Sequence, residues 1–286
     1  MSAHPFAWGA ALAATLVLTA GAGQPGARRY RDAVFPSVSI SEHVPFRQAV
    51  NVKGAVDALT MDVYQPAGDA EDRRPAILWI HGGGFRPGND KRQKYIVTMA
   101  TEFAKRGYVC FAPDYRVRAE IGPDRLPALK DALEDCREAL GWVRSHAAEY
   151  RVDPARVAVG GGSAGGMVAV NLAALEGTPS GASKGVFALV DLWGSPAPAL
   201  KVAGVGPNFP PTIIVHGTAD ELVPFGQSEQ LAAELKAHGV PHELRAIPGA
   251  PHTPTTAMSD ILDWTSAFVF RALAGKEEAA PSRRRW

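Results

Sequence analysis

The feature that most restricts the fold of this chain is a series of short, almost wholly apolar runs separated by stretches with helical periodicity. Strands this apolar must be covered on both faces, which is typical of a parallel sheet with helices on either side. The sequence therefore predicts an α/β fold with a mostly parallel central sheet. The runs are AILWI (76–80), YVCFA (108–112), VAVGG (157–161), VFALVDLW (186–193) and TIIVHG (212–217).

The stretches between these runs predict the helices. Apolar residues between Leu126 and Val143 recur at steps of three and four, which places them on one face of a helix. Further helices are expected at 91–106, from Ala164 onward, at 225–238 and at 259–273. Other strand candidates are TMDVYQP (60–66), which is expected to pair with the stretch around VPFRQAV (44–50), and HELRAIPG (242–249).

Function is expected at the carboxyl ends of these strands, because the loops there converge on one crevice. The segment GGSAG (161–165) stands at such an end and reads G-x-S-x-G. A sharp strand-to-helix turn would hold Ser163 at its apex, and glycine flanks the serine because larger side chains would clash. On this segment alone, a glycine-rich loop that merely turns or holds a phosphate remains an alternative, although the lysine of a P-loop is missing.

A second glycine-rich segment, HGGGF (81–85), directly follows the AILWI run. Consecutive glycines after a strand let backbone N–H groups turn toward a developing oxyanion, and each such donor contributes about 3 to 4 kcal/mol in acyl transfer. An ordinary loose loop is the structural alternative. The equivalent position of Ser163, also at a strand end, favours the catalytic interpretation.

A serine nucleophile needs a base, and the base needs an orienting carboxylate. Asp220, in HGTADELVP, follows one predicted strand, and His252, in PGAPHTP, follows another. The order Ser, Asp, His along the chain is that of α/β-hydrolases. Glu221 is the rival carboxylate, but the shorter side chain of Asp220 suits the loop better. His216 is expected to shape the Asp220 loop.

With these segments assembled, the chain resembles the α/β-hydrolase superfamily and, within it, the hormone-sensitive-lipase-like carboxylesterases. The resemblance covers about residues 62–272. It rests on HGGGF, PDYR (113–116), VDPARVAVGGGSAGG (152–166), HGTADELVP and PGAPHTP, which occur in family order.

The resemblance implies hydrolysis of carboxylic esters through an acyl-enzyme on Ser163, with His252 as the base and Asp220 as its orienting partner. The oxyanion would lie against three backbone N–H groups, and neither a metal nor an organic cofactor would be needed. The implied oxyanion donors are Gly83, Gly84 and Ala164.

The chain also departs from the family pattern. Gly162 stands where relatives usually carry an acidic residue before the serine, and DYRVRAE (114–120) replaces DYRLAPE. Only GSPAPALKVAGVGPNFPP (194–211) fills a position where lipases of this fold often carry a helical lid. Such a minimal cap favours an open crevice and short acyl groups, or acyl groups on a larger alcohol such as a polysaccharide, as in secreted feruloyl or acetyl-xylan esterases.

Three aromatic residues are the candidate substrate-binding residues. Phe85 stands beside the oxyanion glycines, Phe225 follows the Asp220 loop, and Trp193 ends the VFALVDLW run. Trp142 and Trp264 fall in predicted helices and are expected in the core.

Two other functions stay open. One is a lipase or a serine peptidase of the prolyl-oligopeptidase type on the same fold, although the chain has no room for the propeller domain that those peptidases carry. The other is a non-catalytic ligand-binding protein on this fold, although such proteins typically lose a triad member.

The ends of the chain predict export and a single domain. FAWGAALAATLVLTAGAG (6–23) is apolar and ends in small residues, so a signal peptide over 1–22 and a secreted or periplasmic protein are expected. One catalytic domain over 35–275 and a flexible basic tail over 276–286 would follow. An uncleaved anchor and a cytoplasmic protein are the alternatives.

The formal net charge of +1 gives no reason to expect a nucleic acid or an anionic membrane as partner. The expected partner is the ester substrate, and the protein is expected to be a monomer or homodimer with no stable membrane insertion after signal removal. Cys110 and Cys136 are expected to be buried free thiols, with a disulfide between them as the alternative.

Overall fold

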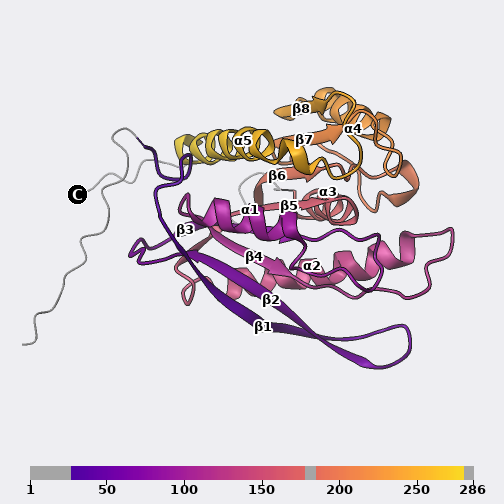
Figure 1. Ribbon diagram of the computed structural model, residues 1–286, viewed down its shortest axis with the longest axis horizontal. Helices are drawn as coiled ribbons and strands as arrows, with labels where there is room; N and C mark the ends of the chain where they lie inside the picture. The colour runs from indigo at the N-terminus through magenta and orange to yellow at the C-terminus, as the bar shows by residue number, and fades with distance from the viewer. Residues whose placement is uncertain (1–26, 178–184, 280–286) are drawn as a thin grey trace, which may run out of the picture.

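The computed structural model describes residues 27–177 and 185–279, with side chains as far as 275, and it is built around an eight-stranded sheet (Figure 1). The strand order is β1-β2-β4-β3-β5-β6-β7-β8. The pairings of β1 with β2 and of β2 with β4 are antiparallel, and the other pairings are parallel, which confirms the predicted mostly parallel sheet. The strands are β1 (Val38–Val50), β2 (Val56–Pro66), β3 (Arg74–Ile80), β4 (Val109–Pro113), β5 (Val152–Gly162), β6 (Val186–Leu192), β7 (Thr212–Gly217) and β8 (His242–Ile247).

Helices cover both faces of the sheet (Figure 1). Successive side chains of a strand point to opposite faces. In β3, Leu78 and Ile80 enter one core and Ile77 and Trp79 enter the other, all fully buried. This two-sided burial is why the runs are apolar throughout. Helices α2 (Leu126–Ser145), α3 (Ala164–Glu176) and α4 (Gly226–Ala237) pack on the first face, and α1 (Lys94–Ala104) and α5 (Met258–Ala279) pack on the second.

Some elements begin or end a few residues from the predicted positions. Helix α1 begins at Lys94 rather than 91, because Lys91 binds the Asp114 carboxylate and Gln93 accepts a hydrogen bond from the Gly82 N–H group. Helix α5 continues to Ala279, past the predicted end at 273 and into the segment expected to be a tail. The boundaries of the catalytic domain stay a prediction, and the predicted signal peptide lies outside the described residues.

The two cysteines are free and buried, as predicted. The sequence suggests that the helix carrying Cys136 packs on the strand carrying Cys110. Cys110, on β4, instead points into the core beneath α1 and α5, whereas Cys136, on α2, lies in the core of the opposite face. The sheet therefore separates the two thiols.

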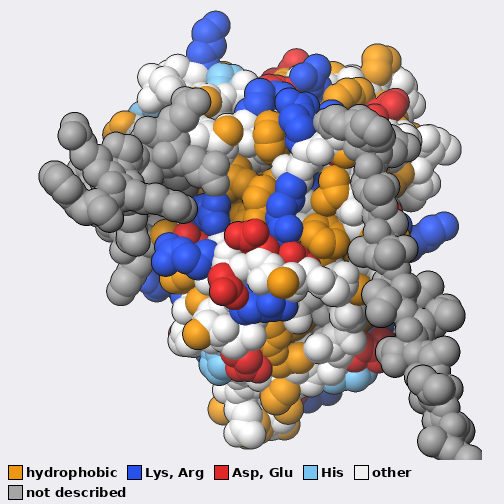
Figure 2. Space-filling model, turned by 90° about the vertical axis from the view of Figure 1, so that its left-hand side faces the viewer, with side chains coloured by type: hydrophobic (Ala, Val, Ile, Leu, Met, Phe, Trp, Pro, Cys, Tyr) orange, Lys and Arg blue, Asp and Glu red, His pale blue; other side chains and the backbone are white. Residues whose placement is uncertain are grey.

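Among the described residues, the segment after β6 adds little secondary structure at the carboxyl ends of the strands. Between β6 and β7 the described chain forms a single short 3-10 turn, η1 (Pro198–Leu200), and no α-helix. On the face seen in Figure 2, basic and acidic side chains lie among hydrophobic ones. None of the helices in the described ranges is both long enough and apolar enough to cross a membrane.

Candidate active site

Ser163 lies in the sharp turn between β5 and α3, with φ 56° and ψ −124°. This conformation is strained for a residue with a side chain, and the packing around it enforces the turn. A Cβ atom on Gly161 would come 2.6 Å from the carbonyl oxygen of Ile80, and a Cβ atom on Gly165 would come 2.1 Å from that same oxygen. Glycine is required on both sides because β3 passes so closely, which fits the predicted strand-to-helix elbow.

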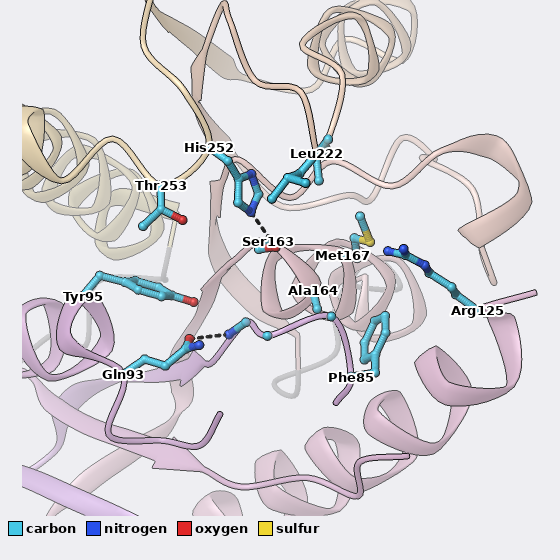
Figure 3. Close-up of a pocket in the computed structure, with 14 residues that line it drawn as sticks. Phe85, Gln93, Tyr95, Arg125, Ser163, Ala164, Met167, Leu222, His252 and Thr253 are labelled. Atoms are coloured by element: carbon cyan, nitrogen blue, oxygen red, sulfur yellow. Dashed lines mark hydrogen bonds between the residues drawn. The ribbon is translucent and has the colours of Figure 1, made fainter. Parts of the chain in front are cut away.

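The structure brings together the three residues of the predicted triad (Figure 3). His252 Nε2 lies 2.9 Å from Ser163 Oγ, and His252 Nδ1 lies 2.7 Å from Asp220 Oδ2. A carboxylate only accepts, so Nδ1 carries the proton and Nε2 is free to accept one from the serine hydroxyl. The residues come from the loops after β5, β7 and β8, which meet at the carboxyl ends of parallel strands.

Asp220 is held as a carboxylate by its surroundings. Its Oδ1 accepts hydrogen bonds from the N–H groups of Leu222 and Val223, each at 2.9 Å. Burial pushes the pKa of Asp220 up, but the hydrogen bonds from Val223, His252 and Leu222 outweigh burial and hold the pKa below its usual value. The rival carboxylate, Glu221, is exposed and lies outside this arrangement.

The glycine loop after β3 is held in place by buried contacts of His81 and Tyr115. The ring of His81 is buried and stacks on Tyr115 at 4.1 Å between ring centres, and the Tyr115 hydroxyl donates to the carbonyl oxygen of His81. Burial lowers the pKa of His81, so its ring is neutral near pH 7. Gly83 and Gly84 have positive φ, and among the described residues none accepts a hydrogen bond from their N–H groups.

A third donor is available beside these two. Ala164 is the first residue of α3, where the opening N–H groups of a helix lack intrahelical acceptors. The three predicted oxyanion donors therefore line one pocket together with Ser163. The Gly82 N–H group, by contrast, is occupied by Gln93 at 2.9 Å.

The pocket has a volume of about 380 Å³. Figure 3 shows its walls, with Phe85 and Met167 on one side of Ser163 and Tyr95 on the other. Phe85, one of the predicted substrate-binding residues, is among the residues that line the pocket. The lining residues are Gly82, Gly83, Gly84, Phe85, Gln93, Tyr95, Arg125, Ser163, Ala164, Met167, Leu222, Val223, His252 and Thr253.

Two of the aromatic residues expected at the substrate lie elsewhere. Trp193 is wholly buried and packs edge-on against Tyr95 at 5.5 Å, in the core beneath α1 and α5. Phe225 packs edge-on against His216 at 5.8 Å, outside the residues that line the pocket. The prediction is corrected for both, because closeness along the chain to a strand end or to Asp220 does not fix which way a side chain points.

Several lining residues are not evident from the sequence. Tyr95 donates a hydrogen bond to the carbonyl oxygen of Gly162 at 3.2 Å, and Gln93 binds Gly82, so both shape the pocket from the start of α1. Leu222 lies in the same segment as Asp220 and is 74 % exposed. Its position two residues after Asp220 is the one signal the sequence carried.

Two family models match parts of the chain. The model described as BD-FAE matches residues 61–187, which include the glycine loop and Ser163. The model described as the prolyl oligopeptidase family matches residues 195–275, which include Asp220 and His252. Each model covers less than half of the chain.

Curated relatives are ester hydrolases and lipases. A probable carboxylic ester hydrolase, LipM of Mycobacterium tuberculosis, is 27 % identical over 62 % of this chain and 48 % of its own length. The secreted triacylglycerol lipase LIP1 of Gibberella zeae is 33 % identical over 47 % of this chain and 24 % of its own length. The chain thus spans about half or less of these two relatives.

Solved structures extend the likeness over most of the fold. Esterase 2 of Thermogutta terrifontis, in a form phosphorylated by paraoxon, matches with a TM-score of 0.62 and 27 % identity, covering 83 % of this chain and 95 % of the esterase. A propionate-bound form of that esterase matches equally well, over 82 % of this chain and 94 % of its own. The fold is thus shared with an esterase along nearly its whole length.

Proposed function

The chain belongs to the α/β-hydrolase superfamily, and from this premise we propose that it is a serine carboxylesterase that hydrolyses short-chain esters through an acyl-enzyme. The observation that carries the proposal is the hydrogen-bonded series Ser163–His252–Asp220 beside unoccupied backbone donors. It supplies a nucleophile, its base and an oxyanion site in one pocket.

The proposed reaction has two steps. His252 Nε2 takes the proton of Ser163 Oγ as the oxygen attacks the ester carbonyl, and the negative charge that forms lies against the N–H groups of Gly83, Gly84 and Ala164. The imidazolium then protonates the leaving alcohol, which leaves the acyl group on the serine. Water repeats the sequence with His252 as base and frees the acid.

In both steps Asp220 keeps the imidazole in the tautomer that leaves Nε2 free to accept, and stabilises the imidazolium. Its lowered pKa supports this role, since a protonated aspartic acid would offer no charge.

The size of the pocket supports short acyl groups. A volume of about 380 Å³ is near the lower end of the usual range for small-molecule sites, roughly 300 to 1,000 Å³. Apolar contact would come from Phe85, Met167 and Leu222. The likeness to an esterase whose structures contain propionate and butyrate supports the same reading, and the sparse cap leaves room for a large alcohol such as a polysaccharide.

Rates on 4-nitrophenyl esters from acetate to palmitate test this function. We expect a steep preference for acetate or butyrate, and a loss of at least about a thousandfold in Ser163→Ala. Tributyrin cleaved more slowly than a long-chain triglyceride would contradict the short-chain proposal. Activity equal in Ser163→Ala, or no labelling of Ser163 by a fluorophosphonate, would instead indicate a non-catalytic binding protein.

The prolyl oligopeptidase match supports one alternative, a serine peptidase. Amide hydrolysis needs the same groups, so the two functions are separated by substrate. Acyl 4-nitroanilides matched to the best ester distinguish them, and we expect turnover of the ester alone.

Export remains part of the proposal. The apolar, small-residue ending at 20–22 supports cleavage after Ala22. The secreted lipase among the relatives supports the same location, and mass measurement of protein from the medium or periplasm would locate the first residue of the mature chain. A chain found only in the cytoplasm with its N-terminus intact would contradict export.

A further inference from the structure

A chain of buried polar side chains continues from the triad into the core. His216 Nε2 lies 2.9 Å from Asp220 Oδ2, and His216 Nδ1 lies 2.6 Å from Ser228 Oγ. Ser228 Oγ lies 2.8 Å from Ser195 Oγ, which lies 2.5 Å from Asp191 Oδ2. The side chains of Asp191, Ser195, Ser228 and His216 are all completely buried. Buried polar groups without a bonding role are costly, so the directions of these bonds can be deduced.

The direction at the His216 end is fixed. Nε2 faces two acceptors, Asp220 Oδ2 and the carbonyl oxygen of Val223 at 3.0 Å. A ring nitrogen between two acceptors must carry a proton. Nδ1 faces a hydroxyl, which can donate or accept, so its state depends on the far end of the chain.

An ionised Asp191 requires a cationic His216. The carboxylate can only accept, so Ser195 donates to it and must itself accept from Ser228. Ser228 has then used its one proton, and the contact with His216 Nδ1 is a hydrogen bond only if Nδ1 also carries a proton. With Nε2 protonated as well, the ring is an imidazolium.

A protonated Asp191 reverses every bond. The carboxyl group donates to Ser195, Ser195 donates to Ser228, and Ser228 donates to Nδ1 of a neutral His216. The two arrangements have the same net charge and differ by the shift of three protons along three hydrogen bonds. If these four residues held a second proton, two donors would face each other at one of the three hydrogen bonds. If they held none, two acceptors would face each other at one of them.

We propose that Asp191, Ser195, Ser228 and His216 form a positioning unit for the triad that holds one proton, with that proton on His216 at neutral pH. The residues act through Asp220 and touch no reacting atom. The proposal rests on the esterase function for its kinetic test but not for its spectroscopic one. The Asp220 carboxylate, 2.9 Å from His216 Nε2, favours a cation at His216. Burial raises the pKa of Asp191 to about 6, which agrees with this arrangement because the carboxyl is then ionised at pH 7.5.

The proposed state has a kinetic consequence. Asp220 Oδ2 accepts from two imidazoles, His216 and His252, and these with Asp191 are the titratable groups that bear on one another through the chain. A cation at His216 takes part of the negative charge of Asp220 that would otherwise support a cation at His252. The carboxylate therefore stabilises a positive charge on His252 less than it would beside a neutral His216.

Asp191→Asn tests the unit. Its amide N–H group can donate to Ser195, which reverses the chain and makes His216 neutral. We expect the acid limb of kcat/KM to move to higher pH by about half a unit or more. Nitrogen NMR of labelled histidine at pH 7.5 is expected to show two protonated ring nitrogens at His216 in the unsubstituted protein and one in the variant.

Two further variants distinguish the proposed effect on the triad from an effect of misfolding. His216→Gln places a neutral amide between Asp220 and Ser228 and should move the acid limb in the same direction. Asp135→Asn is the matched control, because Asp135 is equally buried but binds Arg116 away from the triad. A neutral His216 in the unsubstituted protein, or acid limbs that stay in place in Asp191→Asn and His216→Gln while melting temperatures fall, would overturn the proposal.

A separate observation concerns the charge of the pocket. Among the described residues that line it, Arg125 is the only one with a permanent charge, and no carboxylate lines it. Figure 3 shows the Arg125 side chain extending toward Met167, above the loop that carries Phe85. Within the described ranges its guanidinium has neither a hydrogen bond nor an ion pair, whereas nearby Arg118 is bound to Asp131. A cation left unpaired at a site favours a carboxylate partner, which a guanidinium can bind with two parallel hydrogen bonds.

We infer that the preferred esters carry a carboxylate group at the Arg125 end of the pocket. This inference rests on the proposed esterase function. Two substrate pairs distinguish the acyl side from the alcohol side: monomethyl against dimethyl glutarate, and 4-acetoxybenzoate against its methyl ester. For at least one pair we expect kcat/KM to favour the anion, and Arg125→Gln to lower that anion-to-neutral ratio about tenfold.

Arg86→Gln is the matched control, since Arg86 is exposed beside the glycine loop and does not line the pocket. Arg86→Gln removes the same charge and should leave the anion-to-neutral ratio of kcat/KM unchanged. Arg125→Lys should retain part of the preference for the anion. If Arg125→Gln left the anion-to-neutral ratio of kcat/KM unchanged in both substrate pairs, the inference would be overturned. Because turnover of the neutral esters is measured in the same assay, that result is distinguishable from failure of the esterase function.

Discussion

At the scale of single residues, the site depends on glycines, which have no side chain, as much as on the residues that react. Gly166 and Gly194 pack with their Cα regions in contact beside Asp191, and a Cβ atom on Gly194 would come 2.4 Å from the carbonyl oxygen of Ser163. Without side chains here, β5, α3 and the loop after β6 approach closely enough to hold the strained serine. The Gly-rich stretch around Ser163 is thus a packing requirement of the nucleophile.

Gly165→Ala is expected to destabilise the fold and reduce activity together. Its Cβ atom would lie 2.1 Å from a backbone oxygen of β3, which can move only if the strand moves, so a loss of about 3 kcal/mol in the free energy of unfolding is expected. Denaturant unfolding measures it. Gly204→Ala is the control, because no atom lies within 4 Å of the added Cβ atom and stability should change little. Equal stabilities for the two variants would contradict this account of the turn.

At the scale of elements, the sequence predicted the order of strands and helices and the triad, because both follow from local patterns. Apolar runs mark buried strands, and Ser163, Asp220 and His252 each stand directly after one. Side-chain direction was less predictable. Trp193 directly follows β6 and Phe225 immediately precedes α4, yet both side chains turn into packing contacts, because their rotamers depend on neighbours from α1 and β7 that no local pattern shows.

The buried chain behind the triad shows the same limit. His216 could be predicted to shape the Asp220 loop, and the structure gives it that contact. Its link to Asp191 runs through Ser195 and Ser228, which come from the loop after β6 and from α4. Serines of this kind carry no periodic signal, so their meeting is evident only once the elements are packed.

At the scale of the whole molecule, ion pairs join segments that the sheet alone leaves apart. Arg29 binds Asp69 at 2.5 Å and connects the start of the described chain to the loop before β3. Arg144 of α2 binds Glu176 of α3 at 2.8 Å. Burial pushes the pKa values of Asp69 and Glu176 up, but hydrogen bonds from the arginines outweigh burial and hold both values below normal.

These lowered pKa values predict acid lability. A carboxyl group with a lower pKa in the folded state stabilises the fold fully above its unfolded value, near 4, and loses that contribution as the pH falls through the folded value. The melting temperature should therefore drop steeply only below about pH 4. Thermal melts from pH 8 to pH 3 check this, and a flat profile down to pH 3 would contradict it.

The position of His252 has a consequence for the making of the protein. His252 follows β8, the outermost strand, which pairs with β7 alone, and β8 is the last strand to be synthesised. A growing chain can form the serine turn and the pocket floor long before the base arrives. Under the proposed mechanism, the nascent protein is therefore inactive until the last described strand joins the edge of the sheet and brings His252 to Ser163.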